Sequence, residues 1–185
     1  MADQKPIRIL GIDPGSVTTG VGVIESDGKN SSLIFYGVIK TGGGDIPDRL
    51  KVILSDVTEV ITQWQPHEVA IEDVFVGNNA MSALKLGQAR GAAICAAVQA
   101  DLPVSEYSPT QVKQNIVGTG AATKEQMQHM VKSLLGINVD KLQADAADAL
   151  GIALCHGHSR GLRGEMQLRG NSRKRVGRFL SLIHI

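Results

Sequence analysis

The first 107 residues alternate between short apolar runs and longer segments with helical periodicity. Apolar runs at residues 8–12, 20–25 and 33–41 are joined by short turn-forming segments and predict an antiparallel three-stranded meander. Further runs at 69–75 and 103–107 each follow a helical segment, which favours strands parallel to the first. The pattern therefore predicts an α/β fold whose five-stranded mixed sheet, an antiparallel meander followed by parallel strands, is flanked by helices.

Helical periodicity fills the intervals between these runs. After Asp45, a candidate N-cap, apolar residues recur in steps of four and three as far as Trp64. The helix predicted over 80–100 has a small residue at every fourth position from 83 to 95, so another backbone could approach closely, either the sheet of the same domain or the same helix of a second subunit. Later helices are predicted near 109–114, from Thr123, and over 143–154.

Composition and charge divide the chain into a domain and a tail. Its 185 residues, 43% of them hydrophobic, suffice for one packed domain, which we place at residues 1–158. Residues 1–155 hold 12 Lys and Arg against 17 Asp and Glu, whereas residues 156–185 hold 7 against 1. One-sign charge with low apolar content predicts a basic, disordered tail over 159–185.

The sequence shows no targeting or membrane segment and little cysteine. Residues 1–5 are polar, and no run of 18 apolar residues occurs. Cys95 and Cys155 are far apart within apolar helical patterns, which predicts reduced, buried packing residues. These features predict a soluble cytoplasmic protein.

Four carboxylates in three distant segments are the candidate chemistry. Asp13 ends the first buried strand, and Glu72 ends a run predicted to lie parallel to it. Asp145 and Asp148 are three residues apart and share one face at the start of a helix. Alternatively, Asp13 is an ordinary turn residue and the others are surface charges. If the four converge, their oxygen-only donor set selects Mg²⁺ or Mn²⁺, and two such ions can hydrolyse a phosphodiester.

Other residues near this site are candidates for DNA contact. Phe75 begins a loop beside the site, where it could stack on a base or simply fill the core. Lys85 and Arg90 lie on the polar side of the predicted helix over 80–100, as phosphate contacts or as solvated charges. Lys124 occupies the first turn of its helix, a position that favours anions, which suggests that it meets a phosphate there. The histidines at 156 and 158 lie beyond the site helix and are expected at the surface.

Taken together, four motifs resemble the RuvC family of bacterial Holliday-junction resolvases. They are ILGIDPG (9–15), AIEDVF (70–75), SALKLGQARG (82–91) and QADAADA (143–149). The resemblance covers about residues 8–158, and the tail departs from it. It implies an RNase H-like fold, a homodimer, Mg²⁺-dependent paired nicks in four-way junction DNA, and partnership with RuvA and RuvB. Position by position, it implies that Asp13, Glu72, Asp145 and Asp148 are the catalytic metal ligands, that Phe75 stacks on the junction, and that Lys113 and Lys124 lie near the cleaved strand.

Two other classes of protein share some of these features. Residues 11–20 also resemble the first phosphate loop of actin-like ATPases and sugar kinases, but those folds need a second phosphate loop and a second lobe for which 185 residues leave no room. The remaining alternative is a junction-binding protein whose carboxylates are structural. Such a protein would bind DNA without Mg²⁺ and would never cut it.

Overall fold

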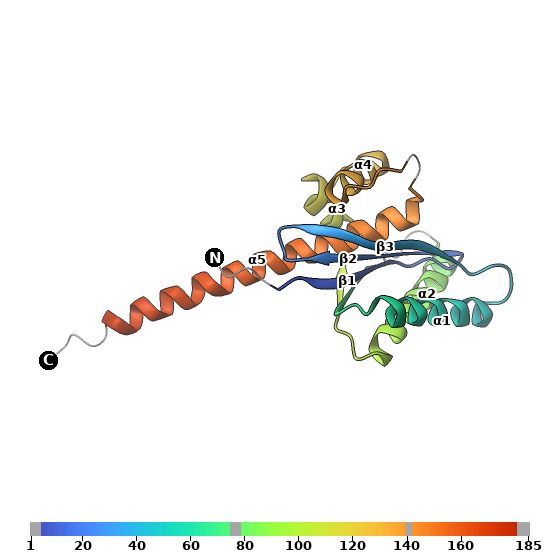
Figure 1. The fold of residues 1–185 in the computed structure, drawn as a ribbon. Coiled ribbons are helices and arrows are strands. Elements are labelled where there is room, and N and C mark those ends of the chain that lie inside the picture. Colours follow the sequence, from blue (N-terminus) through green and yellow to red (C-terminus); the bar gives the residue numbers. More distant parts are fainter. Residues whose placement is uncertain (1–4, 75–78, 140–141, 181–185) are drawn as a thin grey trace.

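A mixed five-stranded sheet forms the centre of the protein. The computed structural model describes residues 5–74, 79–139 and 142–180. The strand order is β3-β2-β1-β4-β5, in which β2 pairs antiparallel with β1 and β3, and β4 pairs parallel with β1 and β5. Figure 1 shows the sheet between two layers of helices. The strands are β1 (Ile7–Asp13), β2 (Thr18–Ser26), β3 (Ser31–Lys40), β4 (Glu68–Glu72) and β5 (Val104–Tyr107). The predicted meander followed by parallel strands is confirmed.

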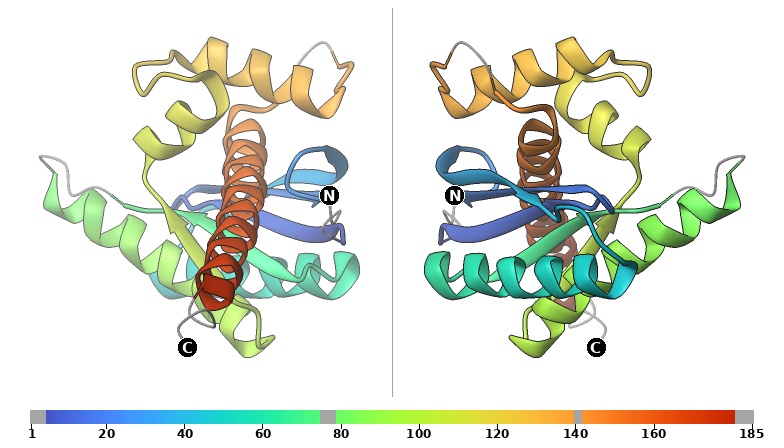
Figure 2. Two further views of the ribbon diagram at one scale, coloured as in Figure 1. Left: turned by 90° about the vertical axis from the view of Figure 1, so that its left-hand side faces the viewer. Right: turned by 90° about the vertical axis from the view of Figure 1, so that its right-hand side faces the viewer.

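Helices cover both faces of this sheet. The pair α1 (Ile46–Trp64) and α2 (Ala80–Gln99) packs on one face, and α5 (Ala144–Leu180) crosses the other. Two shorter helices, α3 (Pro109–Val117) and α4 (Lys124–Leu135), lie over the first part of α5 (Figure 2). The two short helices begin with complete capping boxes, Ser108 with Gln111 and Thr123 with Gln126, as S/T-x-x-Q spacing predicts.

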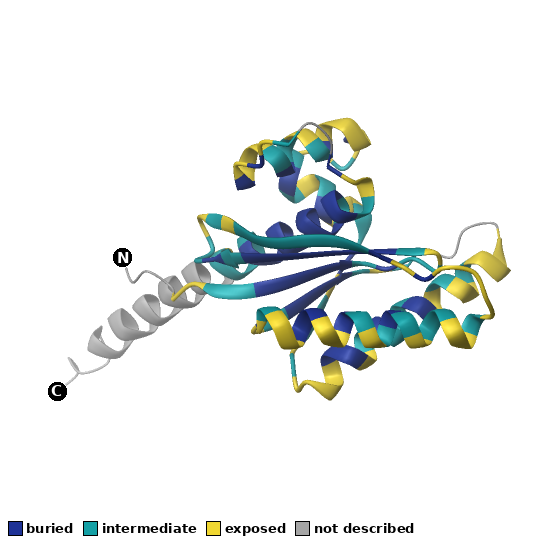
Figure 3. Cartoon of the chain, turned by 45° about the vertical axis from the view of Figure 1, so that its right-hand side comes forward, coloured by how far each residue is buried: buried dark blue, intermediate teal, exposed yellow. Residues whose placement is uncertain are grey.

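Burial on both faces explains why the strand runs are apolar without strict alternation. In β1, Ile9 packs into the core under α5, whereas Leu10 and Ile12 pack into the core against α1 and α2. Figure 3 shows that much of the sheet is buried. Successive strand residues point to opposite faces, so Asp13 shares the α5 face with Ile9. In β4, Ala70 lies in the core under α5, and the same alternation assigns Glu72 to that face.

Glycines bring α5 close to the centre of the sheet. A Cβ on Gly11 would lie 2.0 Å from the Ala149 carbonyl oxygen, and one on Gly20 would lie 1.9 Å from the Asp145 carbonyl oxygen. Both separations are far inside van der Waals contact, so only glycine fits at these strand positions. Because glycine has no side chain, these two positions let α5 approach strands β1 and β2 closely.

The two cysteines differ in their environment. Cys155 on α5 is buried, as predicted, and burial raises the pKa of its thiol to about 11. The prediction that Cys95 is buried is wrong, because it lies exposed on α2. Helix α2 turns its alanines, among them Ala89 and Ala93, toward the core, and this orientation leaves the Cys95 side of the helix outside.

The division into a domain at residues 1–158 and a disordered tail at 159–185 stays a prediction, although residues 159–180 are described as part of α5. These residues continue α5 as a helix, which extends beyond the sheet (Figure 1). The physical reason is the absence of proline from 144 to 180, together with many Arg and Leu residues, which favour helix. Among the described residues, no helix has the length and apolarity to cross a membrane.

Replacing Gly11 tests the close approach of α5. We expect Gly11→Ala to lower the free energy of unfolding by about 2–4 kcal/mol, because the added methyl collides with helix backbone that cannot rotate away. Gly43→Ala is the matched control, since its Cβ would meet nothing within 4 Å. Urea unfolding followed by circular dichroism measures both. Equal stabilities for the two variants would contradict this account of the packing.

Candidate active site

Two of the predicted carboxylates lie at the ends of adjacent parallel strands. Ile12 of β1 is paired with Ile71 of β4, so that Asp13 and Glu72 follow at equivalent positions. Both side chains are partly buried, and both strands end at the same edge of the sheet. Ligands of open α/β sheets bind at this carboxyl edge.

The other two carboxylates come from the first turns of α5. The Asp145 main chain abuts Gly20 of β2, the strand paired with β1, so this end of the helix is fixed over the sheet. A cavity of about 290 Å³ results, bounded by all four predicted acidic residues. Its lining comprises Asp13, Glu72, Pro109, Val112, Lys113, Lys124, Met127, Asp145 and Asp148.

Burial and mutual repulsion change the titration of these acids. Burial, followed by the charge of Glu72, raises the pKa of Asp13 from 3.8 to about 8. Burial, followed by the charge of Asp148, raises the pKa of Glu72 from 4.5 to about 7, although Lys113 and Lys124 oppose the shift. Burial also raises the pKa of Asp148. Without a bound cation, these carboxyl groups therefore keep their protons to a higher pH than ordinary Asp and Glu side chains do.

The donor set fits a hard divalent cation. All four acidic groups offer carboxylate oxygens, the ligands preferred by Mg²⁺ and Mn²⁺, and no histidine or cysteine lines the described cavity. Within the described part of the chain, no three His, Cys, Asp or Glu side chains stand close enough together to hold an ion as they are placed. By its lining, the cavity has the donor types of a site for a divalent cation.

The two predicted site lysines also line the cavity. Lys113 comes from α3 and Lys124 from the first turn of α4. Burial raises the pKa of Asp13, Glu72 and Asp148, and the positive charge of Lys124 opposes this rise at all three. The arrangement places two positive charges in the same cavity as the four carboxylates.

The remaining predicted DNA contacts have different outcomes. Lys85 is exposed on α2, so a DNA contact there stays a prediction. Arg90 is not free: its Nε donates to the Glu72 carbonyl oxygen at 3.0 Å, and its guanidinium pairs with Glu106. This geometry favours a structural role over the predicted phosphate contact. Phe75 lies outside the described residues, and its stacking role also stays a prediction.

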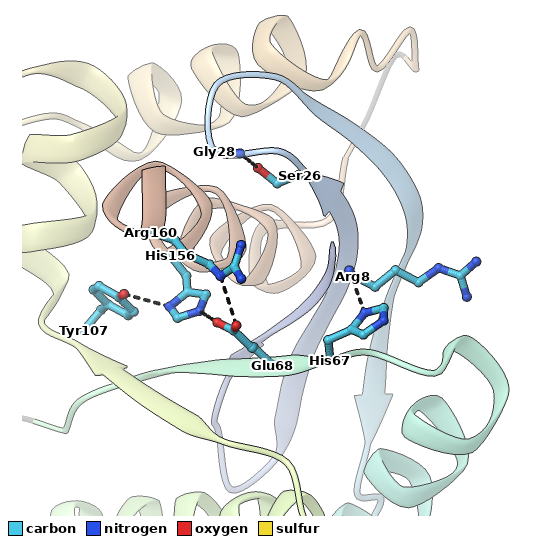
Figure 4. Close-up of polar contacts among 8 residues, drawn as sticks. All are labelled: Arg8, Ser26, Gly28, His67, Glu68, Tyr107, His156 and Arg160. Atoms are coloured by element: carbon cyan, nitrogen blue, oxygen red, sulfur yellow. Dashed lines mark hydrogen bonds and ion pairs between the residues drawn. The ribbon is translucent and has the colours of Figure 1, made fainter. Parts of the chain in front are cut away.

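A buried polar cluster under α5 was missed by sequence reasoning. The prediction that His156 is a surface residue is wrong, because its side chain is 6% exposed. Its Nδ1 lies 2.8 Å from the Tyr107 hydroxyl and its Nε2 lies 2.6 Å from Glu68, which Arg160 also contacts (Figure 4). Burial opposes the Glu68 charge, but the hydrogen bond from His156 and the charge of Arg160 leave the pKa of Glu68 below its usual value.

The cluster joins α5 to β4 and β5 and so fixes the helix along the sheet. The sequence signal was the i, i+4 pair His156 and Arg160 directly after an apolar stretch of helix. His158, also expected at the surface, is half-buried with Nδ1 2.8 Å from Asn115 of α3. Burial lowers the pKa of His158. Among the described residues, the acidic cavity contains no histidine that could act as an acid or base.

A sheet of this order with carboxylates gathered at the ends of β1, β4 and the start of α5 defines an RNase H-like nuclease. The sequence matches the RuvC family, described as "Crossover junction endodeoxyribonuclease RuvC", over residues 9–156. The chain belongs to this family.

Individual relatives agree with this assignment. The Crossover junction endodeoxyribonuclease RuvC of Photobacterium profundum is 62% identical over 151 residues, which cover 82% of this chain and 87% of that protein. Among solved structures, T. thermophilus RuvC in complex with Holliday junction substrate has a TM-score of 0.79 at 36% identity, covering 84% of this chain and 96% of that one. The yeast mitochondrial Holliday junction resolvase Ydc2, with a TM-score of 0.63 at 12% identity over 93% of this chain and 87% of that one, shares the fold.

The raised pKa of Asp13 predicts a pH-dependent effect of its removal. Between 3.8 and about 8 the folded protein binds a proton that the unfolded chain has lost, so Asp13 makes the metal-free fold less stable as pH rises through that range. We expect Asp13→Asn to raise the melting temperature in EDTA, and the gain to grow from pH 5 to pH 8. Calorimetry at both pH values measures it. A gain in melting temperature that shrinks toward pH 8 would contradict the raised pKa of Asp13.

Proposed function

We propose that Asp13, Glu72, Asp145 and Asp148 bind two Mg²⁺ ions, with Mn²⁺ as a substitute, and that the chain uses them to hydrolyse phosphodiesters in four-way DNA junctions. The observation that carries the proposal is the single cavity that all four carboxylates share with Lys113 and Lys124. When bound, two such ions activate the attacking water and stabilise the leaving oxygen.

The residues of the chain prepare this chemistry by their charge. In the metal-free cavity, the raised pKa values of Asp13, about 8, and of Glu72, about 7, mean that both carboxyls hold protons at lower pH. Those protons must leave before the oxygens can act as ligands, so metal affinity rises with pH up to about 8. Lys113 and Lys124 attract the phosphate backbone to a body that is otherwise acidic.

The substrate assignment draws on the family and on the solved complex. The T. thermophilus RuvC structure contains a Holliday junction substrate, and its fold covers most of this chain. We extend that substrate to this protein, with paired symmetric nicks during DNA recombination and repair. Partnership with RuvA and RuvB and a DNA contact by Phe75 belong to the same proposal and follow from the sequence resemblance. So do a cytoplasmic location, which the composition of the chain suggests, and a DNA contact by Lys85, which its place on the polar side of α2 suggests.

An exposed apolar face of α2 supports a homodimer. Met81, Leu84 and Val98 are 62%, 56% and 59% exposed, large values for apolar side chains. Between them, Gly87 and Gly91 have open space where a Cβ would stand. The small residues of α2 could face either the sheet of the same domain or a second copy of α2. The open space at Gly87 and Gly91 is not filled by the sheet, which favours the second copy. A second copy of α2 fits, and a two-fold dimer presents two cavities to two like strands of a junction.

The central test compares Asp13→Asn with the wild-type protein on a synthetic four-way junction and a linear duplex. We expect the variant to bind the junction and to lose nicking by at least about a hundredfold, because a metal ligand is removed without a change of shape. Wild-type cuts should require Mg²⁺ and fall symmetrically on the junction alone.

Asp101→Asn is the matched control, since Asp101 is exposed in a turn after α2 with φ 55°, which asparagine also adopts. It should cut at the wild-type rate. Full cleavage by Asp13→Asn at saturating Mg²⁺ would reject the metal role. Junction binding by the wild-type protein without any cleavage would instead favour the non-catalytic alternative.

A charge on the α2 face tests the dimer. We expect Leu84→Glu to halve the molar mass measured by sedimentation equilibrium, because two like charges would meet across the two-fold axis in an apolar contact. Leu134→Glu on α4 is the control, since this leucine is 40% exposed away from that face. A wild-type protein that sediments as a monomer at all concentrations would refute the dimer.

A further inference from the structure

Arg90 of α2 joins three segments at the edge of the acidic cavity. Its Nε donates to the Glu72 carbonyl oxygen at 3.0 Å, its Nη2 pairs with Glu106 of β5, and the same nitrogen lies 3.7 Å from Asp73. The Arg90 side chain is only 17% exposed, although both carboxylates that it faces are more than half exposed. A guanidinium so covered needs a close carboxylate, which Glu106 supplies, whereas Asp73 lies at longer range.

Two neighbouring acids, Glu72 and Asp73, compete in principle for the same cavity. Glu72 is the last residue of β4 and lines the cavity on the α5 face. Asp73 follows the strand, and its main-chain N–H still donates to the Tyr107 carbonyl at 2.8 Å. Alternation along an extended chain turns its side chain toward the opposite face, where α2 and Arg90 lie.

Among the described residues, few contacts hold the Asp73 side chain there. It is 58% exposed, and besides the ion pair with Arg90 its Oδ1 accepts from the adjacent Val74 N–H at 2.9 Å. A carboxylate next to an acidic metal cavity is attracted by the ion, since divalent cations take Asp and Glu alike. Arg90 supplies the opposing attraction.

We propose that Arg90 is a positioning residue that fixes which carboxylate β4 gives to the metal cavity: it holds the Glu72 main chain in place and keeps Asp73 on the opposite face. The proposal rests on the proposed function, because it presumes that the cavity binds a divalent ion. The guanidinium touches neither the reacting atoms nor the Glu72 carboxylate. It acts through the main chain of one acid and the side chain of the next.

Arginine is suited to this role in a way that lysine is not. The planar guanidinium donates a hydrogen bond to the Glu72 carbonyl through Nε and pairs with the carboxylates through Nη2 at the same time. A lysine has a single ammonium and cannot hold both positions. Arg90→Lys should therefore show a smaller form of the defect of Arg90→Gln, which removes the charge altogether.

The test is a double-mutant cycle on the full-length protein, made of wild type, Arg90→Gln, Asp73→Asn and the double variant. Binding of Mn²⁺ alone to the DNA-free protein is followed by electron paramagnetic resonance, and nicking is measured against Mg²⁺ concentration. We expect Arg90→Gln to weaken Mn²⁺ binding about 10- to 100-fold and to raise half-saturating Mg²⁺ in proportion, as loss of a group that orients metal ligands does.

The other two variants of the cycle test whether Asp73 competes with Glu72 for the metal ion. Asp73→Asn alone should bind Mn²⁺ as the wild type does, and in the Arg90→Gln background it should restore a measurable part of the lost affinity, because the competing carboxylate is gone. Lys51→Gln, which removes a charge from the exposed side of α1, is the control for net charge. If Arg90→Gln does not fold, the same cycle is run with Arg90→Lys.

Two results would overturn the proposal. One is unchanged Mn²⁺ binding in Arg90→Gln with weaker junction affinity and a salt dependence reduced by about one phosphate contact, which would make Arg90 a DNA contact. The other is a defect that Asp73→Asn does not relieve at all. Failure of the proposed function is distinguishable, because Mn²⁺ binding by the wild type would then be absent or unaffected by Asp13→Asn.

Discussion

The close packing of α5 against β1 and β2 is the constraint on which the site depends. Gly11 and Gly20 leave no room for a side chain between sheet and helix, so main-chain atoms of Ala149 and Asp145 come directly against the strands. Farther along α5, the cluster of His156, Glu68 and Tyr107 fixes the helix by directional hydrogen bonds. Contact at one end and hydrogen bonds at the other determine where the two acids of the helix lie relative to the sheet.

This packing has an electrostatic cost that the function explains. Several partly buried carboxylates share one cavity, and burial with mutual repulsion raises the pKa of Asp13 and of Glu72. A fold selected for stability alone would place apolar or paired groups there. Strongly perturbed acids in a cavity with two lysines are instead typical of a site that binds cations and phosphates.

A positive charge, that of Arg90 on α2, lies on the side of β4 that faces away from the acidic cavity. Arg90 engages the main chain of Glu72 together with the carboxylate of Glu106, and it does so from the helix that carries the exposed apolar face of Met81 and Leu84. The proposed dimer contact and the proposed metal ligand are thus connected through one helix. The two proposals therefore assign α2 two roles, one on each side.

The sequence by itself determined the strand order of the meander, the parallel pair that ends in Asp13 and Glu72, and the helical spacing of Asp145 and Asp148. These features depend on local periodicity, turn residues and chain connectivity, which are present in any short window of residues. Only the tertiary structure decided that His156 is buried, that Cys95 is exposed, that Arg90 binds the protein, and that α5 continues through the basic tail. Burial and partner choice depend on which helix face meets which strand across 49 to 88 residues of chain, as the bonds of His156 to Tyr107 and Glu68 show, and no local pattern encodes that distance.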